Sequence, residues 1–548
     1  MKLKPDFIFE SSWEVCNKVG GIYTVLATRA NTMQKLFPDK VVFIGPDLGK
    51  HSNTTFTEDS GIMTEWQAVA AQAGIKCRVG RWNIPGQPIA ILLNSQQYYV
   101  RKNEIYLHLW EDYGVDSLHA YGDYDEASMF AYAVARLVEN IHNNFLNGQR
   151  VIFHANEWML GVALLYLHRY VPQVATIFTT HATTVGRSIA GNGKDLYSYL
   201  PGYYGNQMAR ELNVDSKHSV EQKAAQNADC FTTVSAITAR ECTQLLERRP
   251  DELLLNGFED DFVPAAKDFG AKRWMARKQL LDVADCLTGG HQPEDTLIVS
   301  TSGRYEFRNK GLDVFVDAMA RLRALLPAGK QVLAFVNVPA WVASPREDLA
   351  DRMSGKQPRG AALACPYLTH WLHNMETDRM LQMLKRHGFH NRPEDNVKVI
   401  FVPCYLDGED GIINKHYYDI VLGNDLCIYP SYYEPWGYTP LEAIAFSVPC
   451  VTTDLAGFGI WAREELNAVA TIENGVEVIH RSDTNYHEVA EQVAQTVSRY
   501  AQLPETEKEG ARKKARQLSK KALWKHFFAA YERAYDHALK NAKKRNNI

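Results

Sequence analysis

Short, continuous apolar runs recur along the whole chain and predict buried β-strands. In the first half the runs are DFIFES, KVVFIG, AILLN, RVIFHA, ATIFTTH and DCFTTVS. In the second half they are TLIVSTSG, QVLAFVN, VKVIFVP, DLCIYPS and PCVTTD. Several are rich in β-branched residues and do not alternate with polar ones, which is typical of parallel strands that are covered on both faces.

Stretches with apolar residues at helical spacing lie between these runs. One such stretch carries Leu312, Phe315, Met319, Leu322 and Leu326. Strands that alternate with helices predict an α/β fold built from doubly wound sheets. Because the chain has 548 residues, it is too long for one hydrophobic core, and more than one such domain is expected.

An acidic, irregular stretch at residues 257–274 separates the two series of strands and helices. We therefore predict two Rossmann-like domains, at residues 1–265 and 266–522, that face each other across a cleft. Residues 341–396 interrupt the second domain as an insertion of helices and loops, and residues 523–548 form a C-terminal helix that docks on the body. Ligands of such sheets bind at the carboxyl ends of the strands.

Charge and composition exclude several classes of protein. The net charge of -4, from 60 basic and 64 acidic residues, does not suggest a nucleic-acid binder. The chain has no apolar run of about 18 residues, so we expect no membrane span. Its N-terminus has no apolar h-region, so we expect no signal peptide. Its nine cysteines are scattered without a CxxC pair, which argues against a disulfide framework and against a zinc or other metal site. Reduced thiols in a cytoplasmic protein fit best.

Two features of the first half could bind an anion. Gly20 and Gly21 lie between a predicted strand and a predicted helix, where backbone N–H groups and the helix N-terminus favour negative charge, and Lys18 adds a full charge. The motif is neither a dinucleotide fingerprint nor a P-loop, and a glycine pair alone is often only a turn. Further along, His181 ends a strand and Arg187 follows it as a donor suited to phosphate.

The second half repeats this pattern twice. Arg304, Arg308 and Lys310 lie just before a helix that begins near Gly311, and such a group of cations suits a diphosphate. Later, a strand ends and the segment Gly457–Phe458–Gly459 opens a helix whose amides could bind phosphate. Together these features predict a nucleoside diphosphate held between the two domains.

The stretch SYYEPWGYTPLE contains two glutamates with different explanations. Thr439, Pro440 and Glu442 match an N-cap, a first helical position and the third residue of a capping box, so Glu442 has a structural explanation. Glu434 lies before this helix, on a loop that also offers the Trp436 ring and the Gly437 backbone. A carboxylate, open backbone donors and an aromatic face are what a sugar requires, so we expect Glu434 to contact one.

These residues resemble a known family. The segments SYYEPWGYTPLE, GRYEFRNKG, NKVGGIYTVL, IFTTHATTVGR and TTVSAIT are similar to those of animal and fungal glycogen synthases, which are retaining glycosyltransferases of family three with the GT-B fold. The resemblance extends from Phe9 to about Phe528. It implies transfer of glucose from UDP-glucose to the non-reducing end of an α-1,4-glucan, without a further cofactor.

The resemblance also implies roles for single residues. Glu434 would contact the donor sugar, Glu442 the ribose, and Arg304 and Lys310 the leaving diphosphate, with His181 lining the sugar site. The residues expected at the donor are Lys18, Gly20, Gly21, Arg187, Trp436, Gly437, Tyr438, Thr439, Glu442, Gly457, Phe458 and Gly459.

Some positions depart from the family pattern. The stretch that resembles its arginine-dense helix, the binding site for glucose 6-phosphate, keeps only Arg512 and Arg516 beside lysines. Asn156 stands where the family has a second histidine, and the insertion that fungal members use for oligomerisation looks shorter. These losses favour a compact, unregulated prokaryotic member and leave a homo-oligomer open.

Two other functions stay open on the sequence alone. The first is the same reaction with ADP-glucose as the donor, since only Tyr405 suggests a contact to the base. The second is a catalytically silent glucan-binding protein, against which the presence of Glu434, Arg304 and Lys310 argues.

Overall fold

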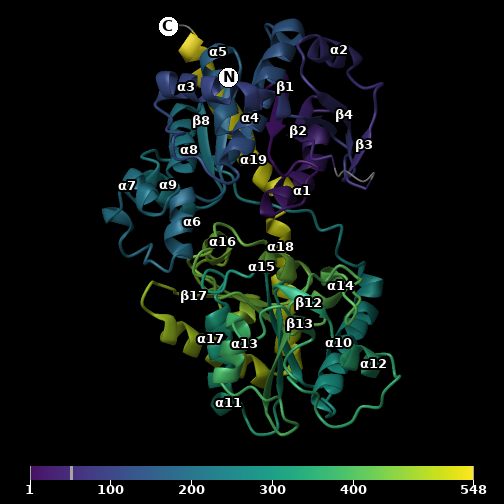
Figure 1. The fold of residues 1–548 in the computed structure, drawn as a ribbon. Coiled ribbons are helices and arrows are strands. Elements are labelled where there is room, and N and C mark those ends of the chain that lie inside the picture. The colour runs from purple at the N-terminus through teal and green to yellow at the C-terminus, as the bar shows by residue number, and fades with distance from the viewer. Residues whose placement is uncertain (1, 50–53, 547–548) are drawn as a thin grey trace. The chain divides into compact units, whose positions relative to one another are not determined.

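The computed structural model describes residues 2–49 and 54–546, and the chain divides into two compact units. Unit 1 comprises Met1–Glu259 together with Ala522–Ile548, and unit 2 comprises Asp260–Lys521. Figure 1 shows the last helix, in yellow, among the purple and blue elements of unit 1. Within the described residues, every helix is too short or too polar to cross a membrane.

Unit 1 is built on one sheet with the strand order β3-β4-β5-β2-β1-β6-β7-β8-β9. From β5 to β9 all neighbouring strands are parallel, and β3 and β4 add an antiparallel edge. The strands are β1 (Phe7–Ser11), β2 (Val41–Pro46), β3 (Phe56–Glu58), β4 (Cys77–Trp82), β5 (Ile89–Leu93), β6 (Val151–Asn156), β7 (Ala175–Thr180), β8 (Cys230–Thr233) and β9 (Glu252–Leu253). The six apolar runs of the first half are all strands, and β2, β5, β6, β7 and β8 are buried on both faces, as predicted.

Helices connect these strands. They are α1 (Gly21–Leu36), α2 (Thr64–Gln72), α3 (Lys102–Tyr113), α4 (Tyr124–Ile141), α5 (Gly161–Tyr170), α6 (Thr184–Gly191), α7 (Gly205–Glu211), α8 (Asp215–Asn227), α9 (Ala236–Leu245) and, from the end of the chain, α19 (Trp524–Asn546). Thirteen of the 18 residues of α4 are buried, because this helix packs in the main core cluster of the unit.

Helix α19 completes the core of unit 1 around a buried ion pair. Arg29 of α1 pairs with Glu10 of β1, and both side chains are at most 1% exposed. The guanidinium of Arg29 lies 4.1 Å from the ring centroid of Tyr531 and 5.6 Å from that of Trp524, so two aromatic rings of α19 enclose the cation. One face of the last helix is therefore part of the core of this unit, while its other face is exposed.

Unit 2 has a fully parallel six-stranded sheet with the order β14-β11-β10-β15-β16-β17. Its strands are β10 (Leu297–Ser302), β11 (Val332–Asn337), β14 (Val397–Val402), β15 (Leu426–Ile428), β16 (Cys450–Thr453) and β17 (Val476–Ile479). The five apolar runs of the second half are β10, β11, β14, β15 and β16, which confirms those predictions, whereas β17 was not predicted.

The helices of unit 2 cover its sheet. They are α10 (Ala266–Thr288), α11 (Leu312–Leu325), α12 (Glu347–Met353), α13 (Arg379–Arg386), α14 (Tyr417–Val421), α15 (Tyr438–Ala445), α16 (Gly457–Glu465), α17 (Tyr486–Gln502) and α18 (Glu505–Lys521). The stretch predicted as an insertion contains α12, α13 and a small antiparallel sheet of β12 (Val342–Pro345) and β13 (His370–Leu372).

Each sheet has a point at which the strand order reverses. In unit 1 it lies between β1 and β6, and in unit 2 between β10 and β15. The loops that leave neighbouring strands at such a point diverge, and ligands of doubly wound sheets bind in the crevice that they leave. The residues after β1, β6, β10 and β15 are therefore the first place to look for a site.

Candidate functional site

The two loops that follow β10 and β15 meet in an ion pair. Lys310 lies on the loop after β10 and Glu434 on the loop after β15, and the ammonium group pairs with the carboxylate Oε2. The two side chains are only 15% and 14% exposed. The predicted diphosphate cation and the predicted sugar carboxylate therefore lie together at the reversal point of unit 2.

Backbone contacts fix these two loops against each other. The Asn309 carbonyl oxygen accepts hydrogen bonds from the amides of Tyr432 (2.9 Å) and Tyr433 (3.1 Å). The buried guanidinium of Arg481 donates to the Pro430 carbonyl oxygen. Arg481 also lies 5.6 Å from the centroid of the Tyr432 ring. Lys310 and Glu434 are thus held in register by atoms that no sequence motif marks.

The remaining cations of this loop differ in exposure. Arg304 is exposed and pairs with Glu306 at 2.8 Å. Arg308 packs its guanidinium 4.6 Å from the centroid of the Tyr432 ring. Of the predicted cations, Lys310 is therefore the one that the structure brings to Glu434, while Arg304 lies at the solvent-facing end of the loop.

Trp436 does not offer an open face to a sugar, contrary to the prediction. It is 3% exposed, and its ring packs against the rings of Phe458 and Trp461 with centroid distances of 6.4 Å and 6.2 Å. The apolar ring gains more from burial in this cluster than a solvent-facing position would give. Trp436 therefore anchors the loop that carries Glu434.

The helix after Glu434 begins earlier than predicted, so the capping box is wrong. Helix α15 starts at Tyr438, and its N-cap is Gly437, with φ 111° and no side-chain cap. A Cβ atom on Gly437 would lie 3.3 Å from the Cγ atoms of Glu434 and Pro440, so the turn requires glycine for its φ and for its space. Thr439 is then inside the first turn, and Glu442 accepts a hydrogen bond from the Tyr418 hydroxyl at 2.7 Å instead of capping the helix.

The glycines that open α16 have structural partners. The amide of Gly457 donates to the Glu434 carbonyl oxygen (3.1 Å), and the amide of Phe458 donates to that of Trp436 (2.8 Å). A Cβ atom on Gly459 would lie 2.0 Å from the carbonyl oxygen of Thr453, so close packing explains this glycine. The predicted phosphate role of the Gly457 and Phe458 amides is not supported, because both already hold the Glu434 loop in place.

In unit 1, the first glycine of the pair already donates its amide to a carboxylate of the same unit. The Oε2 atom of Glu14 accepts hydrogen bonds from the amides of Gly20 (2.9 Å) and Tyr23 (2.7 Å). This carboxylate meets the partial positive charge at the start of α1. Gly21 and Lys18 are exposed beside it, with the Lys18 ammonium 6.0 Å from the centroid of the Tyr23 ring.

His181 is a neutral, oriented imidazole. Burial lowers the pKa of His181 to about 3, and the nearby charges of Arg29 and Arg187 act in the same direction. Its Nε2 lies 3.0 Å from the Oδ1 of Asn156, whose amide nitrogen donates to Glu10 (3.2 Å). Because the Asn156 oxygen must then accept, His181 carries its proton on Nε2 and a lone pair on Nδ1.

A glutamate that the sequence interpretation passed over lies beside His181. Glu157 follows β6, and its Oε1 accepts hydrogen bonds from the amides of His181 (2.8 Å) and Ala182 (3.1 Å). Burial is the largest cause acting on the carboxyl group of Glu157, and it raises the pKa. The positive charge of Arg187, on the exposed side of α6, acts in the opposite direction. The signal was available, because Glu157 directly follows a strand at the reversal point of the sheet.

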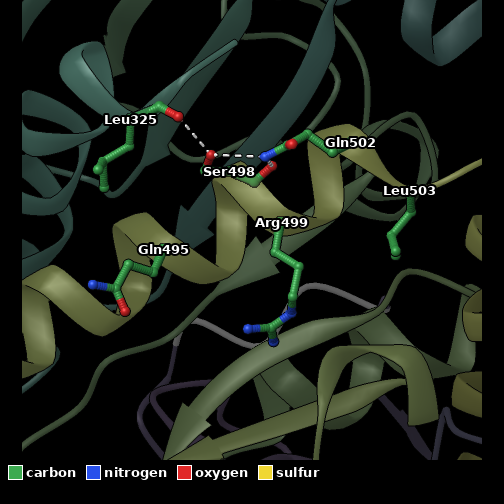
Figure 2. A pocket seen from close by; sticks show the side chains of 6 residues that line it. All are labelled: Leu325, Gln495, Ser498, Arg499, Gln502 and Leu503. Carbon is green, nitrogen blue, oxygen red and sulfur yellow. Dashed lines mark hydrogen bonds between the residues drawn. The ribbon is translucent and has the colours of Figure 1, made fainter.

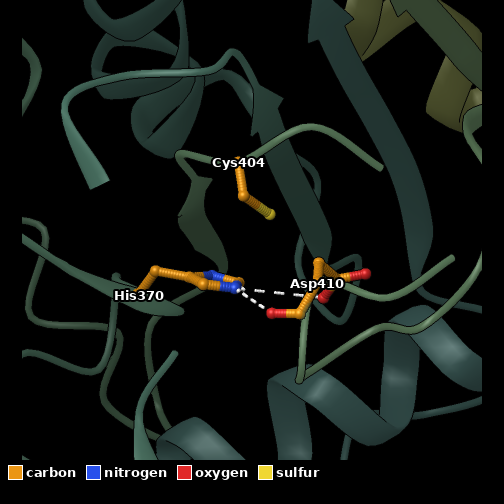
Figure 3. A group of neighbouring side chains, drawn as sticks. All are labelled: His370, Cys404 and Asp410. Atoms are coloured by element: carbon orange, nitrogen blue, oxygen red, sulfur yellow. Dashed lines mark hydrogen bonds and ion pairs between the residues drawn. The ribbon is translucent and has the colours of Figure 1, made fainter. Parts of the chain in front are cut away.

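One cluster of the described residues brings three metal-ligand types within 4.8 Å of one another: His370, Cys404 and Asp410. Figure 3 shows the imidazole directed at Asp410, with Nε2 2.9 Å from the main-chain oxygen. Both carboxylate oxygens of Asp410 accept backbone amides of the following turn, at 2.7 to 3.0 Å. Because the imidazole and carboxylate already have hydrogen-bond partners, the cluster is explained as a structural support of this turn.

All nine cysteines are free thiols, as predicted.

A hollow in unit 2 lies away from the Lys310–Glu434 pair. Figure 2 shows its lining, which comes from the end of α11 and from α17: Leu325, Gln495, Ser498, Arg499, Gln502 and Leu503. Helix α11 begins at the carboxyl edge of the sheet and runs back along it, so Leu325 lies at the opposite edge. We assign this hollow no part in the candidate site.

Comparison with known proteins shows the family of this chain. Residues 10–351 and 349–546 match the sequence pattern of a family described as Glycogen synthase. The chain belongs to the glycogen synthase family.

Relatives in this family match the chain over most of its length. The glycogen [starch] synthase of Neurospora crassa is 30% identical, over 99% of this chain and 85% of the relative. That of Caenorhabditis elegans is 31% identical over 90% of this chain and 82% of the relative. The human liver glycogen [starch] synthase is 28% identical over 98% of this chain and 84% of the relative.

Solved structures support the fold of this glycogen synthase family member. The catalytic domain of starch synthase IV from Arabidopsis thaliana, bound to ADP and acarbose, superposes with a TM-score of 0.55 at 16% identity, over 97% of this chain and 99% of that one. Sucrose-phosphate synthase from Thermosynechococcus elongatus gives 0.53 at 15% identity, over 96% and 98%. The fold is therefore GT-B, with two α/β units, as predicted.

The two arginines predicted to remain from the family's regulatory helix are engaged in unit 2. Arg512 of α18 pairs with Asp425 (2.8 Å) and Glu505 (2.9 Å). Arg516 pairs with Asp260 (2.8 Å) and donates to the Ala445 carbonyl oxygen (2.7 Å). In this glycogen synthase family member, both guanidinium groups tie α18 to its own unit.

Proposed function

We propose that this protein is a glycogen synthase that transfers glucose from UDP-glucose to the non-reducing end of an α-1,4-glucan, with retention of configuration. The observation that carries the proposal is the Lys310–Glu434 pair at the reversal point of unit 2. The names of the full-length relatives point the same way. The nine free thiols support a cytoplasmic location.

Lys310 would bind the diphosphate of the donor. In the free protein its charge is balanced by Glu434, so the site holds little net charge from this pair. An incoming diphosphate would compete for the ammonium and release the carboxylate. Negative charge grows on the diphosphate as it leaves, and a fixed cation at that position stabilises the transition state more than the ground state. Arg304, which is exposed, would add a second cation on donor binding.

Glu434, once released, would accept hydrogen bonds from hydroxyl groups of the donor glucose. The carboxylate is mostly buried, and the Gly457 amide holds its main chain, so it is oriented before the sugar arrives. The acceptor hydroxyl would attack the anomeric carbon from the face that the diphosphate leaves, and its proton would pass to the departing phosphate oxygen. Configuration is then retained without a second carboxylate on the opposite face, which distinguishes this route from that of glycosidases.

Two side chains of unit 1 have the chemistry that the family resemblance assigns to them: a neutral histidine and an exposed cation. His181 keeps a lone pair on Nδ1 at all physiological pH values, because its pKa is far below them. A neutral imidazole accepts a hydrogen bond from a hydroxyl group without adding positive charge at the anomeric carbon. Arg187, on the exposed side of α6, would bind phosphate.

Tyr405 is the candidate contact for the base of the donor. Tyr405, on the loop after β14, is 74% exposed. Ala340 lies beside the start of this loop, because its amide donates to the Pro403 carbonyl oxygen at 2.9 Å. An exposed ring at the carboxyl edge of the sheet can stack on either uracil or adenine, so the proposal of UDP-glucose rests on the family resemblance of the sequence, and ADP-glucose is the alternative.

The experiment supplies glycogen with either UDP-glucose or ADP-glucose, both carrying labelled glucose, and follows label in the polymer. Incorporation from UDP-glucose is expected. Glu434→Gln should abolish it, whereas Glu464→Gln, an exposed glutamate of α16, should not. Incorporation from ADP-glucose alone would correct the donor. Glycogen binding without consumption of either donor would overturn the proposal in favour of a silent glucan-binding protein.

A further inference from the structure

Two buried glutamates and one partly buried glutamate, from three parts of unit 1, lie around the start of helix α6. Glu157 follows β6, Glu221 lies on α8 and Glu241 lies on α9, and the relative exposure of Glu221 and Glu241 is at most 1%. No sequence motif selected Glu221 or Glu241, and the proposed transfer reaction assigns them no role. Buried carboxylates are rare unless they are paired, so this group requires an explanation.

The three carboxylates hold four consecutive residues. Glu157 accepts the amides of His181 and Ala182, as described above. The hydroxyl of Thr183 donates to Glu241 at 2.8 Å, and the amide of Thr184 donates to Glu221 at 3.0 Å. These carboxylates therefore hold the segment that leads into α6, which begins with His181, and the first residue of the helix, Thr184. Arg187 lies on the same helix, one turn further on.

The backbone at Glu157 is strained. This residue has φ 73° and ψ 165°, a region that is essentially restricted to glycine and costs about 1–3 kcal/mol for other residues. Such strain persists only where the surroundings fix it, and it concentrates at functional sites. Here the Glu157 amide donates to the Thr179 carbonyl oxygen at 2.9 Å, and the side chain accepts the amides of residues 181 and 182.

The charges around Glu221 do not balance if every carboxyl group is ionised. In the described part of the chain, the titratable groups that act on Glu221 and its neighbours include Glu157, Arg187, Glu241 and Cys242, and Arg187 is the cation among these four. The Oε1 atom of Glu221 is buried without a hydrogen-bond partner in the described part of the chain. Burial, and then the charge of Glu157, raise the pKa of Glu221 to about 8.

We propose that Glu221 is a positioning residue that carries a proton at neutral pH and so keeps the start of α6, with His181 and Arg187, in place beside Glu157. The proton lies on Oε1, because Oε2 accepts the Thr184 amide. Loss of this proton would place a second negative charge beside that of Glu157 and push the two carboxylates apart. The segments that they hold, residues 157 and 181–184, would then move. The link from this movement to catalysis rests on the proposed function.

The first test does not depend on activity. A carboxyl group whose pKa is raised by folding stabilises the protein at low pH, and this contribution is lost as pH rises from its ordinary pKa, near 4.5, to its raised value, about 8. Glu221→Gln keeps the size of the side chain and an acceptor for the Thr184 amide, but it has no titratable proton. The midpoint temperature of unfolding should therefore fall less steeply with pH between these values in Glu221→Gln than in the wild type. Glu211→Gln, at an exposed glutamate of α7, is the matched control and should follow the wild type.

The second test measures positioning through the pH profile of transfer. In the wild type, kcat/KM should fall by about tenfold between about pH 7 and pH 9, as one essential proton is lost. In Glu221→Gln this alkaline limb should disappear, while Glu211→Gln keeps it. An unchanged limb in Glu221→Gln would overturn the positioning role.

The two tests separate failure of this inference from failure of the proposed function. If the wild type transfers no glucose, the proposed function fails, and the stability measurement still decides whether Glu221 holds a proton. Identical pH dependence of stability in Glu221→Gln and the wild type would overturn the inference. If Glu221→Gln does not fold, infrared titration of the wild type decides, because the signal of one protonated carboxyl group should disappear near pH 8.

Discussion

A double-mutant cycle on Lys310 and Glu434 tests whether the structure places the candidate site correctly. The single variants are Lys310→Met and Glu434→Gln, each of which removes one charge and keeps most of the side-chain volume. Because the side chains are 15% and 14% exposed, each single variant leaves a mostly buried charge without its partner. The double variant removes both charges, so it should cost less than the sum of the two single changes.

The magnitude follows from burial. A hydrogen-bonded pair between charged groups contributes about 1.5–3 kcal/mol, and some exposure to solvent places this pair near the lower end. We expect each single variant to lower the free energy of unfolding by about 2 kcal/mol. For a unit of this size that is a fall of roughly 4–8 °C in the midpoint temperature. The coupling energy of the cycle should be at least about 1.5 kcal/mol.

Chemical denaturation of the wild type and the three variants measures this coupling. The control cycle uses Arg101 and Glu104, an exposed pair three residues apart at the start of α3, whose coupling should be far weaker. Equal coupling energies in the two cycles, or additive losses at Lys310 and Glu434, would refute the conclusion that these side chains form a buried pair. The placement of the site at the reversal point of unit 2 would then lose its main support.

Three other predictions concern separate parts of the molecule. Arg29→Met should lower the free energy of unfolding by about 3–5 kcal/mol, since it leaves the Glu10 carboxylate buried and unpaired; a loss below about 1 kcal/mol in chemical denaturation would contradict the burial of this pair. Gly437→Ala should cost about 1–3 kcal/mol through its positive φ and reduce transfer more than the control Gly510→Ala, on an exposed face of α18; equal activity of the two variants would contradict the required turn. Glucose 6-phosphate should leave the rate of transfer unchanged, because Arg512 and Arg516 are engaged in ion pairs; activation by severalfold would show that this helix binds it.

The apolar pattern predicted the long, fully buried strands, including the edge strand β14, but not the short or partly exposed strands at the other edges. Strands β10, β11 and β14 are six-residue segments buried on both faces, so each produces a continuous apolar run. The edge strand β3 has three residues, two of them exposed, and β17 alternates with glutamate. Strand order is a property of long-range pairing, and no local pattern records it.

The sequence predicted those site residues whose chemistry suits the ligand and which follow a strand. It missed residues whose role depends on contacts with distant parts of the chain. Lys310 and Glu434 were found because each follows a strand. Thr439 was wrongly predicted as an N-cap, because its local pattern fits the rule but Gly437 already starts the helix at a positive φ. Glu221 was missed because a glutamate within a polar helix looks like a surface residue until α6 and Glu157 pack against it.

The path of the chain through the two units has a consequence for biosynthesis. Unit 2 is one continuous segment, Asp260–Lys521, so it can fold as soon as this segment has left the ribosome. Unit 1 begins first but must wait for α19, whose Trp524 and Tyr531 enclose Arg29. Until the final helix is synthesised, the buried ion pair of Arg29 and Glu10 lacks its aromatic cover. The domain that starts at the N-terminus is therefore the last to be completed, and nascent chains interrupted after residue 521 would hold a finished second unit attached to an unfinished first one.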